Sequence, residues 1–486
     1  MNITALIHRY IANGPVICGM DGQVVSVATI EREFRALRQW FSSFASTNER
    51  VALQLRKDYR YFLAILACME TGTVFIPLRM NWPEQRVKQI EALSGYRMLV
   101  TDEVVERVLA APPETASNGI PLDGDRPLYC MFTSGTTGEP KGVVIPRSAY
   151  GNFLSWVETF FADIGPADRL LNSTDYTFDV SLAEVAIALT RSPAFHCSRF
   201  ENDLFVLLQE LHEYRISVIA TVPNNLMLLL DKRLLGRVDL SALRHVLVAG
   251  ARFPLALVRQ FQELLPTARL YNCYGPTEAT IYCIACELTG DEVDFVVSDT
   301  VSVGQAIRGC EALVVDDDMK PTMPGEKGEL LIGGVQLMAG YLNDPVATAR
   351  VMVELDGQRY YRTGDLAFTD SSGDYYVAGR NDDTVKVAGQ RVNLSDIDAY
   401  VEKLEFVTAC ATVAANDPIR GVRLVLYLVP RTPVTREETM AALAAVLVPS
   451  QIPQDVIFCS DLPVNNSGKT CKRTLLSKYI YGQPSS

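Results

Sequence analysis

The sequence predicts an α/β protein with a large N-terminal domain of layered α/β sheets, a small β subdomain, and a small α+β domain at the C-terminal end. The chain has 486 residues, which is long for a single hydrophobic core. Between about residues 50 and 250, short apolar strands alternate with helical patterns, whereas from about 300 to 380 short strands are separated by glycine turns. We therefore expect an N-terminal domain over residues 1–381, with the β subdomain at about 300–380, and a C-terminal domain over residues 382–486.

The alternation in the N-terminal region begins with a strand, a helix and a strand at Val51–Leu55, Tyr59–Met69 and Val74–Pro77. Ile216–Ala220 predicts a later strand, and Asn225–Asp231 predicts the helix that follows it. Short, continuous apolar runs are typical of buried strands, so this region is expected to form layers whose sheets are largely buried. In the β subdomain, we expect strands at Ala312–Val315, Gly328–Ile332, Tyr360–Arg362 and Tyr375–Val377.

The C-terminal region is expected to fold as a compact unit after a polar linker, Asn381-Asp382-Asp383. A large domain joined to a small one by a short hinge is typical of an enzyme that closes or rotates over its substrate. Within this unit the patterns predict a helix capped by Ser395 that runs to about Leu404, a hairpin of Ala409–Ala415 and Val422–Val429 around Asn416-Asp417-Pro418, and a helix from the capping box Thr435–Glu438 to about Val448.

Composition excludes several classes of protein. The net charge is −12 and no basic block offsets it, which argues against a nucleic-acid or anionic-membrane partner. No apolar run approaches the eighteen or so residues that span a bilayer. The N-terminal segment Met1–Gly14 carries His8 and Arg9 and lacks the layout of a signal peptide. A cytoplasmic enzyme is therefore expected.

The eleven cysteines are scattered and odd in number, which indicates small buried thiols and argues against a disulfide framework. Cys283 and Cys286 have the spacing of a metal or redox pair. They lie in an apolar, strand-like run with no second pair or histidine cluster nearby, so we interpret them as structural. The four histidines are far apart and offer no metal-ligand spacing.

The segment Thr133–Gly142 is the most informative stretch of the chain. It lies between two predicted strands, Pro127–Phe132 and Val143–Ile145, and holds three glycines, four hydroxyl side chains and one lysine. Glycines let backbone N–H groups approach an anion, hydroxyls donate to phosphate oxygens, and Lys141 adds a positive charge. Pro140 before that lysine, with no Ser or Thr after it, excludes a Walker A loop. The segment predicts a site for the phosphates of a nucleotide, with a plain turn as the alternative.

Three later motifs supply complementary groups. In Asn272–Glu278, Tyr274 can stack on a purine, Asn272 can bind its edge, Thr277 can bind a phosphate, and Glu278 can bind Mg²⁺. The second motif places Asp365 after a tight turn, where its carboxylate suits the ribose hydroxyls, and Arg380, just before the linker, can contact ribose or phosphate. The third motif, Asn466-Ser467-Gly468-Lys469, places a lysine on a turn near the C-terminus. Each motif alone is more often a turn than a site, but their order along one chain indicates a nucleotide site.

These residues resemble the adenylate-forming superfamily, specifically the amino-acid adenylation domains of nonribosomal peptide synthetases. The resemblance covers nearly the whole chain and implies the acyl-adenylate synthetase fold. Further segments similar to family motifs are Glu70–Pro77, Gly328–Leu342, Gly379–Asp398 with Asp382 at the pivot, and Leu462–Arg473. The sequence departs from the family pattern at Arg79, Arg147 and Ala251-Arg252-Phe253-Pro254, none of which removes a group that the chemistry requires.

The resemblance implies a ligase that uses ATP and Mg²⁺. A substrate carboxylate would attack the α-phosphorus, giving an acyl-adenylate and pyrophosphate, with Lys469, Thr277 and Glu278 as catalytic residues and Glu278 as the metal ligand. The small domain would then rotate at Asp382, so that a phosphopantetheine thiol of a carrier protein attacks the adenylate. The residues implied to bind ATP are Thr133, Ser134, Gly135, Thr136, Thr137, Gly138, Lys141, Asn272, Cys273, Tyr274, Gly275, Asp365 and Arg380.

The substrate class depends on Asp179. In relatives that activate amino acids, the aspartate at this position contacts the α-ammonium group. Relatives that activate aryl acids have a similar motif with asparagine at this position. A carboxylate beside an apolar strand is costly unless it is paired, so an ammonium partner is favoured over an internal Lys or Arg. By resemblance, a medium or large apolar or aromatic side chain would be surrounded by Val180, Ala183, Ala220, Leu247, Ala249, Cys273, Ile281 and Tyr282.

Alternatives remain open at this point. A D-alanine–carrier-protein ligase would have larger side chains around its substrate than Ala183, and an acyl- or aryl-CoA ligase is opposed by Asp179. A non-catalytic nucleotide-binding protein is disfavoured because Lys141, Glu278, Asp365 and Lys469 are all present. No carrier-domain pattern precedes Ser486 and no condensation domain precedes the motifs, so we expect a free-standing enzyme whose carrier protein is supplied in trans.

Overall fold

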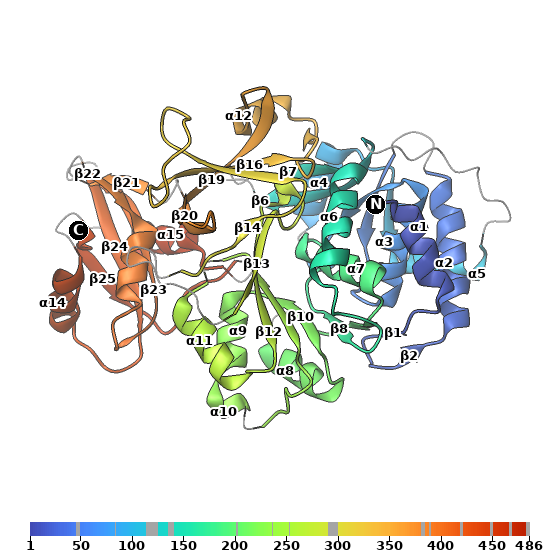
Figure 1. Ribbon diagram of the computed structural model, residues 1–486, viewed down its shortest axis with the longest axis horizontal. Coiled ribbons are helices and arrows are strands. Elements are labelled where there is room, and N and C mark those ends of the chain that lie inside the picture. The colour runs from blue at the N-terminus through green and yellow to red at the C-terminus, as the bar shows by residue number, and fades with distance from the viewer. Residues whose placement is uncertain are drawn as a thin grey trace.

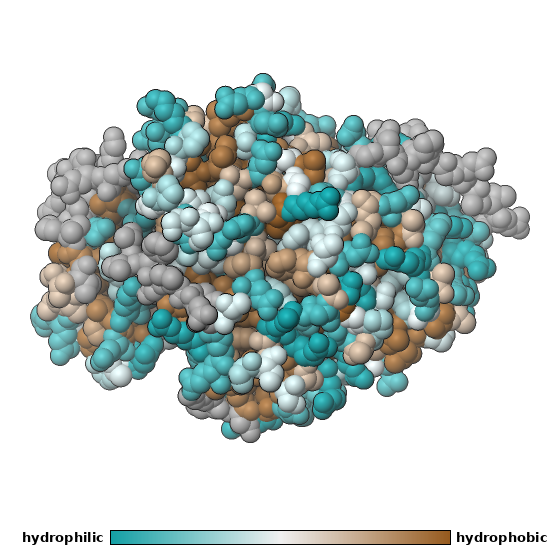
Figure 2. Space-filling model, viewed as in Figure 1, coloured by the Kyte–Doolittle hydropathy of each residue, from teal (hydrophilic) through white to brown (hydrophobic). Residues whose placement is uncertain are grey.

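The computed structural model describes most of the chain: residues 1–44, 49–82, 84–112, 125–134, 140–200, 203–235, 237–251, 253–289, 300–380, 384–387, 390–417, 421–447, 451–465 and 469–482. Figure 1 shows the N-terminal helices at the right, a second α/β layer at the bottom, and the C-terminal elements at the left. Hydrophilic and hydrophobic residues are interspersed over the face drawn in Figure 2, where a notch separates the left and lower parts. Among the described residues, no helix combines the length and apolarity needed to cross a bilayer.

A six-stranded sheet with the order β17-β7-β6-β4-β3-β5 forms one layer. The pairs β3–β4, β3–β5 and β4–β6 are parallel, and β6–β7 and β7–β17 are antiparallel. Its strands are β3 (Arg50–Gln54), β4 (Val74–Pro77), β5 (Met98–Thr101), β6 (Pro127–Ser134), β7 (Pro140–Pro146) and β17 (Gly340–Tyr341). The accompanying helices are α1 (Ile3–Ala12), α2 (Val27–Ser42), α3 (Tyr59–Thr71), α4 (Glu84–Ser94) and α5 (Asp102–Ala110).

A nine-stranded sheet with the order β14-β13-β12-β11-β10-β8-β9-β1-β2 forms the second layer. Its strands are β1 (Ile17–Cys18), β2 (Val24–Val25), β8 (Arg169–Asn172), β9 (Ala194–Cys197), β10 (Val218–Thr221), β11 (His245–Ala249), β12 (Arg269–Tyr274), β13 (Ile284–Leu288) and β14 (Gln305–Ala306). The helices that follow these strands or precede them are α6 (Arg147–Phe160), α7 (Val180–Arg191), α8 (Leu204–Glu213), α9 (Pro223–Leu229), α10 (Lys232–Leu235) and α11 (Leu255–Leu264). The predicted alternation of strands and helices is confirmed in both layers.

One hydrophobic cluster joins the two sheets. It includes Phe75 and Tyr129 from the six-stranded sheet, Val218 and Tyr271 from the nine-stranded sheet, and Leu182 from α7, all of them buried. Helix α3 is buried along almost its whole length, as expected of a helix with apolar residues on every face. Because this core is continuous, the start of α7 has a fixed position relative to the ends of the strands.

A five-stranded antiparallel sheet follows, with the order β15-β16-β19-β18 and β20 paired to β19. It contains β15 (Cys310–Val315), β16 (Gly328–Gly334), β18 (Met352–Leu355), β19 (Gln358–Thr369) and β20 (Tyr375–Arg380), and helix α12 (Pro345–Val351). The four strands predicted for this region are present, and β18 is an additional one.

The C-terminal elements have a hydrophobic cluster of their own, which includes Ile397, Leu426 and Leu443. They are β21 (Thr384–Val387), β22 (Gln390–Asn393), α13 (Leu394–Val401), β23 (Val407–Asp417), β24 (Gly421–Pro430), α14 (Arg436–Val446), β25 (Asp455–Phe458) and α15 (Lys472–Gly482). The predicted hairpin is confirmed as β23–β24.

Two helix starts in this region test the capping arguments. The capping box is confirmed, since Thr435 and Glu438 bond reciprocally at the start of α14, which ends at Val446. The prediction that Ser395 caps the first helix of this region, α13, is wrong. Asn393 is the cap of α13, and its side chain accepts the N–H of Ser395. The strand β22 runs directly into the helix, which places the cap two residues earlier than the sequence pattern indicated.

Candidate active site

Several segments that are distant in the sequence meet near the ends of β11 and β12. The short helix η2 (Thr277–Ala279) follows β12, and Asp179 lies at the start of α7 after β8. The β6–β7 hairpin, β17 and the turn in β19 complete the set. Ligands of open α/β sheets bind outside the carboxyl ends of the strands, which is where these segments lie.

Lys141, Tyr341 and Glu278 form a connected group. Thr133 pairs with Lys141 across the β6–β7 hairpin, and Tyr341 pairs with Val143 on β7. The Lys141 Nζ lies 5.2 Å from the centroid of the Tyr341 ring, and the Tyr341 hydroxyl donates to Glu278 Oε1 at 2.7 Å. The structure thus brings a predicted phosphate ligand to the ring face, and the predicted metal ligand to the hydroxyl, of one tyrosine.

Not every predicted phosphate ligand can be placed. The backbone of Ser134 belongs to β6, whereas Gly135, Thr136, Thr137 and Gly138 lie outside the described residues. Asp382, the predicted hinge, also lies outside them, and Arg380 is described only through its backbone in β20, where it pairs with Asp365.

Tyr274 and Asp365 form the part of the site expected to bind the nucleoside. The Tyr274 hydroxyl donates to Asp365 Oδ2 at 2.5 Å. Asp365 follows Gly364, whose φ of 69° makes the turn, and its N–H bonds to Thr363 Oγ1 at 2.9 Å. Burial raises the pKa of the Tyr274 hydroxyl well above its usual range, so this group stays a neutral donor. Asn272 is buried, and its amide donates to the Ser302 carbonyl at 2.8 Å.

Asp179 is partly exposed as a residue, but its Oδ2 is shielded from solvent and has no hydrogen-bond partner among the described residues. Burial raises the pKa of this carboxyl to about 6, and the charge of Glu278 adds to the rise, whereas hydrogen bonding from Thr277 opposes it. No lysine or arginine in the described part of the chain forms an ion pair with Asp179. The described residues therefore provide no internal salt bridge for Asp179, which was the alternative to an ammonium partner.

The residues expected around the substrate side chain belong to one hydrophobic cluster. Ala220 pairs with Leu247 between β10 and β11, and Ala249 pairs with Cys273 between β11 and β12. These four are buried, as are Ala183, Ile281 and Tyr282, while Val180 packs against the cluster. The eight predicted lining residues thus belong to one hydrophobic cluster, and Val180 joins that cluster to Asp179 at the start of α7.

Lys469 reaches the end of β11 from the C-terminal elements. Its Cε lies 3.8 Å from the position that a Cβ atom on Gly250 would occupy. Hydrogen bonds hold the turn, since the Lys469 N–H donates to Asn465 Oδ1 at 3.0 Å and the Asn465 N–H donates to the Lys469 carbonyl at 2.7 Å. The side chain thus lies beside Gly250, the residue after the lining residue Ala249.

The loop that carries Ile281 and Tyr282 has a strained backbone. Thr280 and Ile281 have φ angles of 59° and 72°, which β-branched residues rarely adopt. Gly275 passes so close that a Cβ there would lie 2.3 Å from the Ile281 carbonyl oxygen. Strain of this kind persists where surrounding contacts over-determine it, and it concentrates at functional sites.

Gln336 supplies those contacts and was not predicted. Its fully buried amide donates to the carbonyls of Ala279, Thr280 and Tyr282 at 2.9–3.2 Å, and the Thr280 hydroxyl donates to the Gln336 carbonyl at 2.6 Å. A polar residue inside the otherwise apolar Leu330–Met338 run was the available signal. Tyr341 was also missed as a site residue, because its role depends on contacts across the sheet.

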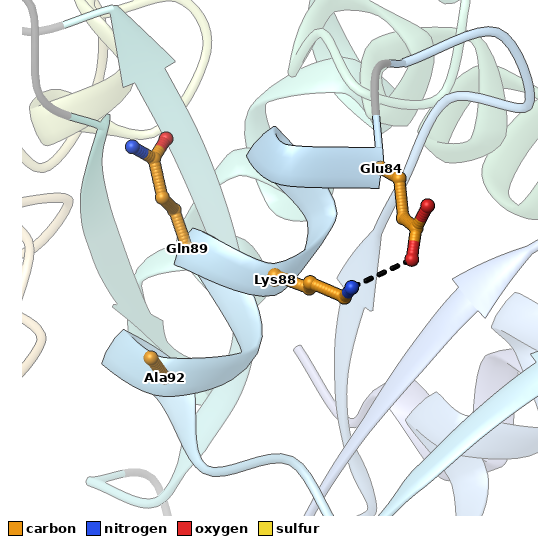
Figure 3. A pocket seen from close by; sticks show the side chains of 4 residues that line it. All are labelled: Glu84, Lys88, Gln89 and Ala92. Atoms are coloured by element: carbon orange, nitrogen blue, oxygen red, sulfur yellow. Dashed lines mark ion pairs between the residues drawn. The ribbon is translucent and has the colours of Figure 1, made fainter.

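An open depression of about 490 Å³ lies elsewhere, on the exposed face of α4 (Figure 3). It is lined by Glu84, Lys88, Gln89 and Ala92, and Glu84 and Lys88 form a 2.7 Å ion pair. These residues share one helix and include none of the site residues. An exposed pair spaced by four residues is ordinary helix-surface chemistry, so the depression has no part in the site.

Comparisons with known proteins agree with this geometry. Residues 12–342 match the family model described as AMP-binding enzyme, and residues 396–469 match that of the AMP-binding enzyme C-terminal domain. The dapdiamide synthesis protein DdaD of Enterobacter agglomerans is 32% identical over 449 residues, which cover 90% of this chain and 74% of that protein. Enterobactin synthase component F of Escherichia coli (strain K12) is 29% identical over 489 residues, covering 94% of this chain and 37% of that protein.

Among solved structures, Klebsiella oxytoca NpsA in complex with 3-hydroxyanthranilyl-AMSN has a TM-score of 0.86 at 20% sequence identity. The match covers 98% of this chain and 99% of that chain. This similarity confirms the expected fold class, with a large mixed α/β N-terminal part and a small C-terminal part.

Replacing Gln336 by alanine is expected to release the strained loop. The variant loses three donations to buried carbonyls, which should lower the free energy of unfolding by about 2–3 kcal/mol. Hydrogen exchange of residues 279–282 should accelerate, and the melting temperature should fall. Gln89→Ala on the exposed face of α4 is the matched control and should change neither quantity. Equal melting temperatures for the two variants would contradict the role of Gln336.

Proposed function

The chain belongs to the AMP-binding enzyme family, and we propose that it activates an amino acid as aminoacyl-AMP, with release of pyrophosphate. It is an adenylating enzyme of the type found in nonribosomal peptide synthesis, and such enzymes use ATP. The proposal rests chiefly on Asp179, a shielded carboxylate with no cationic partner in the described part of the chain. An α-ammonium group is the partner that such a carboxylate lacks.

The residues around Asp179 fit the adenylation step. A substrate held through its ammonium group would have its side chain among Ala183, Ala220 and the other lining residues, and its carboxylate toward Lys469. That lysine would offset the negative charges of the carboxylate and the α-phosphate as they approach, which is the main requirement of phosphoryl chemistry. Asp365 would bind the ribose hydroxyls, and Tyr274 would stack on the adenine.

Mg²⁺ fits the donor set at Glu278. The ion takes oxygen ligands and is commonly held by one or two carboxylates together with substrate phosphates. Glu278 supplies such a carboxylate on the same group of contacts as Lys141. When bound there, the ion would offset charge on the phosphates.

The second part of the proposal is transfer to a carrier protein. We infer that the acceptor is a phosphopantetheine thiol of a carrier supplied in trans, and that the division into residues 1–381 and 382–486 allows the small domain to rotate at Asp382. The position of Lys469 beside Gly250 is the arrangement expected for adenylation. In the second step the thiol must reach the carbonyl carbon of the adenylate, close to the place that Lys469 would occupy during adenylation. Lys469 would therefore have to withdraw before the transfer.

The test of the proposed function is ATP–pyrophosphate exchange across panels of amino, aryl and fatty acids. We expect an amino acid to support exchange, because an aryl or fatty acid leaves Asp179 without a partner. Asp179→Asn should lower kcat/KM for the amino acid about 10²–10⁴-fold, since breaking a buried charge pair costs about 3–5 kcal/mol. Asp203→Asn, which changes the cap of α8, is the control and should leave exchange unchanged. Exchange with aryl or fatty acids alone would refute the amino-acid assignment.

The raised pKa of Asp179 predicts a pH dependence. Because the pKa of this carboxyl is about 6, the free enzyme progressively loses its negative charge as the pH falls through that value. An amino group stays protonated over the same range, so kcat/KM for the amino acid should fall about tenfold per pH unit below pH 6. The measurement is exchange between pH 5 and 8. The acidic limb should disappear in Asp179→Asn, and a flat profile in the parent enzyme would contradict the prediction.

The two half-reactions should respond differently to loss of Lys469. Removing one preorganised positive donor costs on the order of 10²–10³-fold in rate, so Lys469→Ala should cripple exchange. Supplied with preformed aminoacyl-adenylate, the variant should still load a carrier protein. Asp382→Pro, which fixes a backbone angle at the proposed hinge, should do the reverse. Lys478→Ala, an exposed lysine of α15, serves as control. Equal losses of both steps in Lys469→Ala would refute the rotation.

A further inference from the structure

A buried polar cluster adjoins the apolar lining residues. Its centre is Glu184 on α7, which follows the lining residue Ala183 in the chain. The Glu184 side chain is fully buried. The Glu184 carboxylate accepts from the Asn172 amide at 2.5 Å and from the Thr174 hydroxyl at 2.9 Å. Ser173 links this group to the lining, because its hydroxyl donates to the carbonyl of Ala220 at 3.1 Å. Polar groups therefore lie directly beside two small lining residues.

The cluster already contains a balanced pair of charges. The Lys57 ammonium donates to the Ser173 carbonyl at 2.6 Å, and its charge acts on Glu184. Burial lowers the pKa of Lys57 and raises that of Glu184 to about 7, and each charge opposes the effect on the other. A further charged group here would have no counter-charge, so a neutral ligand group is favoured.

Four buried polar atoms without partners belong to residues that make up this cluster or lie within electrostatic reach of Glu184 or Asp179. The hydroxyls of Tyr282, Tyr176 and Tyr129 and the Oδ1 of Asn172 are shielded from solvent and make no hydrogen bond to any described residue. Tyr282 and Tyr176 both lie within electrostatic reach of Glu184, and Tyr282 and Tyr129 within reach of Asp179. Buried polar groups are nearly always paired in native proteins, so unpaired atoms gathered beside a substrate site call for a ligand that pairs them.

We infer that the substrate side chain ends in a neutral hydrogen-bonding group that both accepts and donates, with a carboxamide as the best fit; this rests on the proposed function. The apolar lining surrounds the stem of the side chain. The Tyr282 hydroxyl then donates to the carbonyl oxygen of the ligand, and Asn172 Oδ1 accepts from its NH₂ group. Tyr282 is thus a specificity-determining residue, and the expected apolar side chain is refined to one with a polar end. A site built to pair a polar group discriminates strongly against the analogue that lacks it.

The first test compares near-isosteric amino acids in ATP–pyrophosphate exchange. The pairs are asparagine with leucine, glutamine with methionine, and tyrosine with phenylalanine. Within the pair that supports the fastest exchange, the polar member should have a kcat/KM at least about tenfold higher. An apolar member that equals or exceeds its polar partner overturns the inference and leaves the amino-acid assignment intact. Exchange with aryl or fatty acids alone refutes the proposed function itself, so the two failures are distinguishable.

The second test begins with a measurement on the free enzyme that needs no known substrate. Tyr282→Phe removes an unpaired buried hydroxyl, so the melting temperature of the free enzyme should stay the same or rise. Tyr150→Phe is the matched control, because that buried hydroxyl donates to the Leu182 carbonyl at 2.9 Å, and its loss should lower the melting temperature. With the preferred polar amino acid, Tyr282→Phe should lower kcat/KM about 10–100-fold and spare the KM for ATP. A fall in melting temperature equal to that of Tyr150→Phe would show that the Tyr282 hydroxyl is already paired within the protein, and would overturn the inference.

Discussion

The Asp179 carboxylate lies at the start of α7 without a described cationic partner, and much of the surrounding structure serves to hold it there. Helix α7 is buried along almost its whole length, and its apolar side chains belong to the hydrophobic core that joins the two main sheets. The segment before the helix is anchored as well, since Arg79 pairs with Asp175 at 3.1 Å and stacks over Phe178. A carboxylate that raises the free energy of the empty protein can persist only in such a rigid frame, and binding of a cationic group relieves that cost.

The same principle applies to the loop after η2. The β-branched residues Thr280 and Ile281 adopt backbone angles that they would avoid in an unfolded chain, and Gln336 fixes them through the carbonyls on either side. The energy that holds this loop comes from a residue more than fifty positions away in the sequence. The position of two lining residues is therefore set by tertiary contacts and not by local preference.

Local signals in the sequence account for much of the fold. The strands and helices of the N-terminal layers, the β23–β24 hairpin and the box at Thr435 were predictable, because hydrophobic periodicity and turn chemistry act over a few residues. The motifs also named Asp179, Glu278, Asp365 and Lys469, and the structure brings each close to other predicted site residues. The cap at Asn393 was missed because the strand before it leaves no turn.

Contacts between distant segments could not be predicted in this way. Tyr341 meets Lys141 and Glu278 only because β17 adds to the edge of the six-stranded sheet. Lys57, between β3 and α3, donates to the carbonyl of Ser173, the residue after β8, so this contact joins segments that follow strands of the two main sheets. Neither pairing has a spacing that a pattern could detect, since each depends on how the sheets pack. The buried charges of Glu184 and Lys57, next to the small lining residues, were not predicted for the same reason.

Tyr341 contacts both a cationic and an anionic group of the site, one through the face of its ring and the other through its hydroxyl. Any rotation of this side chain that follows one of the two charges changes its contact with the other. A metal ion bound at Glu278 and a polyphosphate bound at Lys141, as proposed, would therefore be coupled through a single aromatic ring. By thermodynamic reciprocity, each ligand should alter the affinity for the other by the same factor.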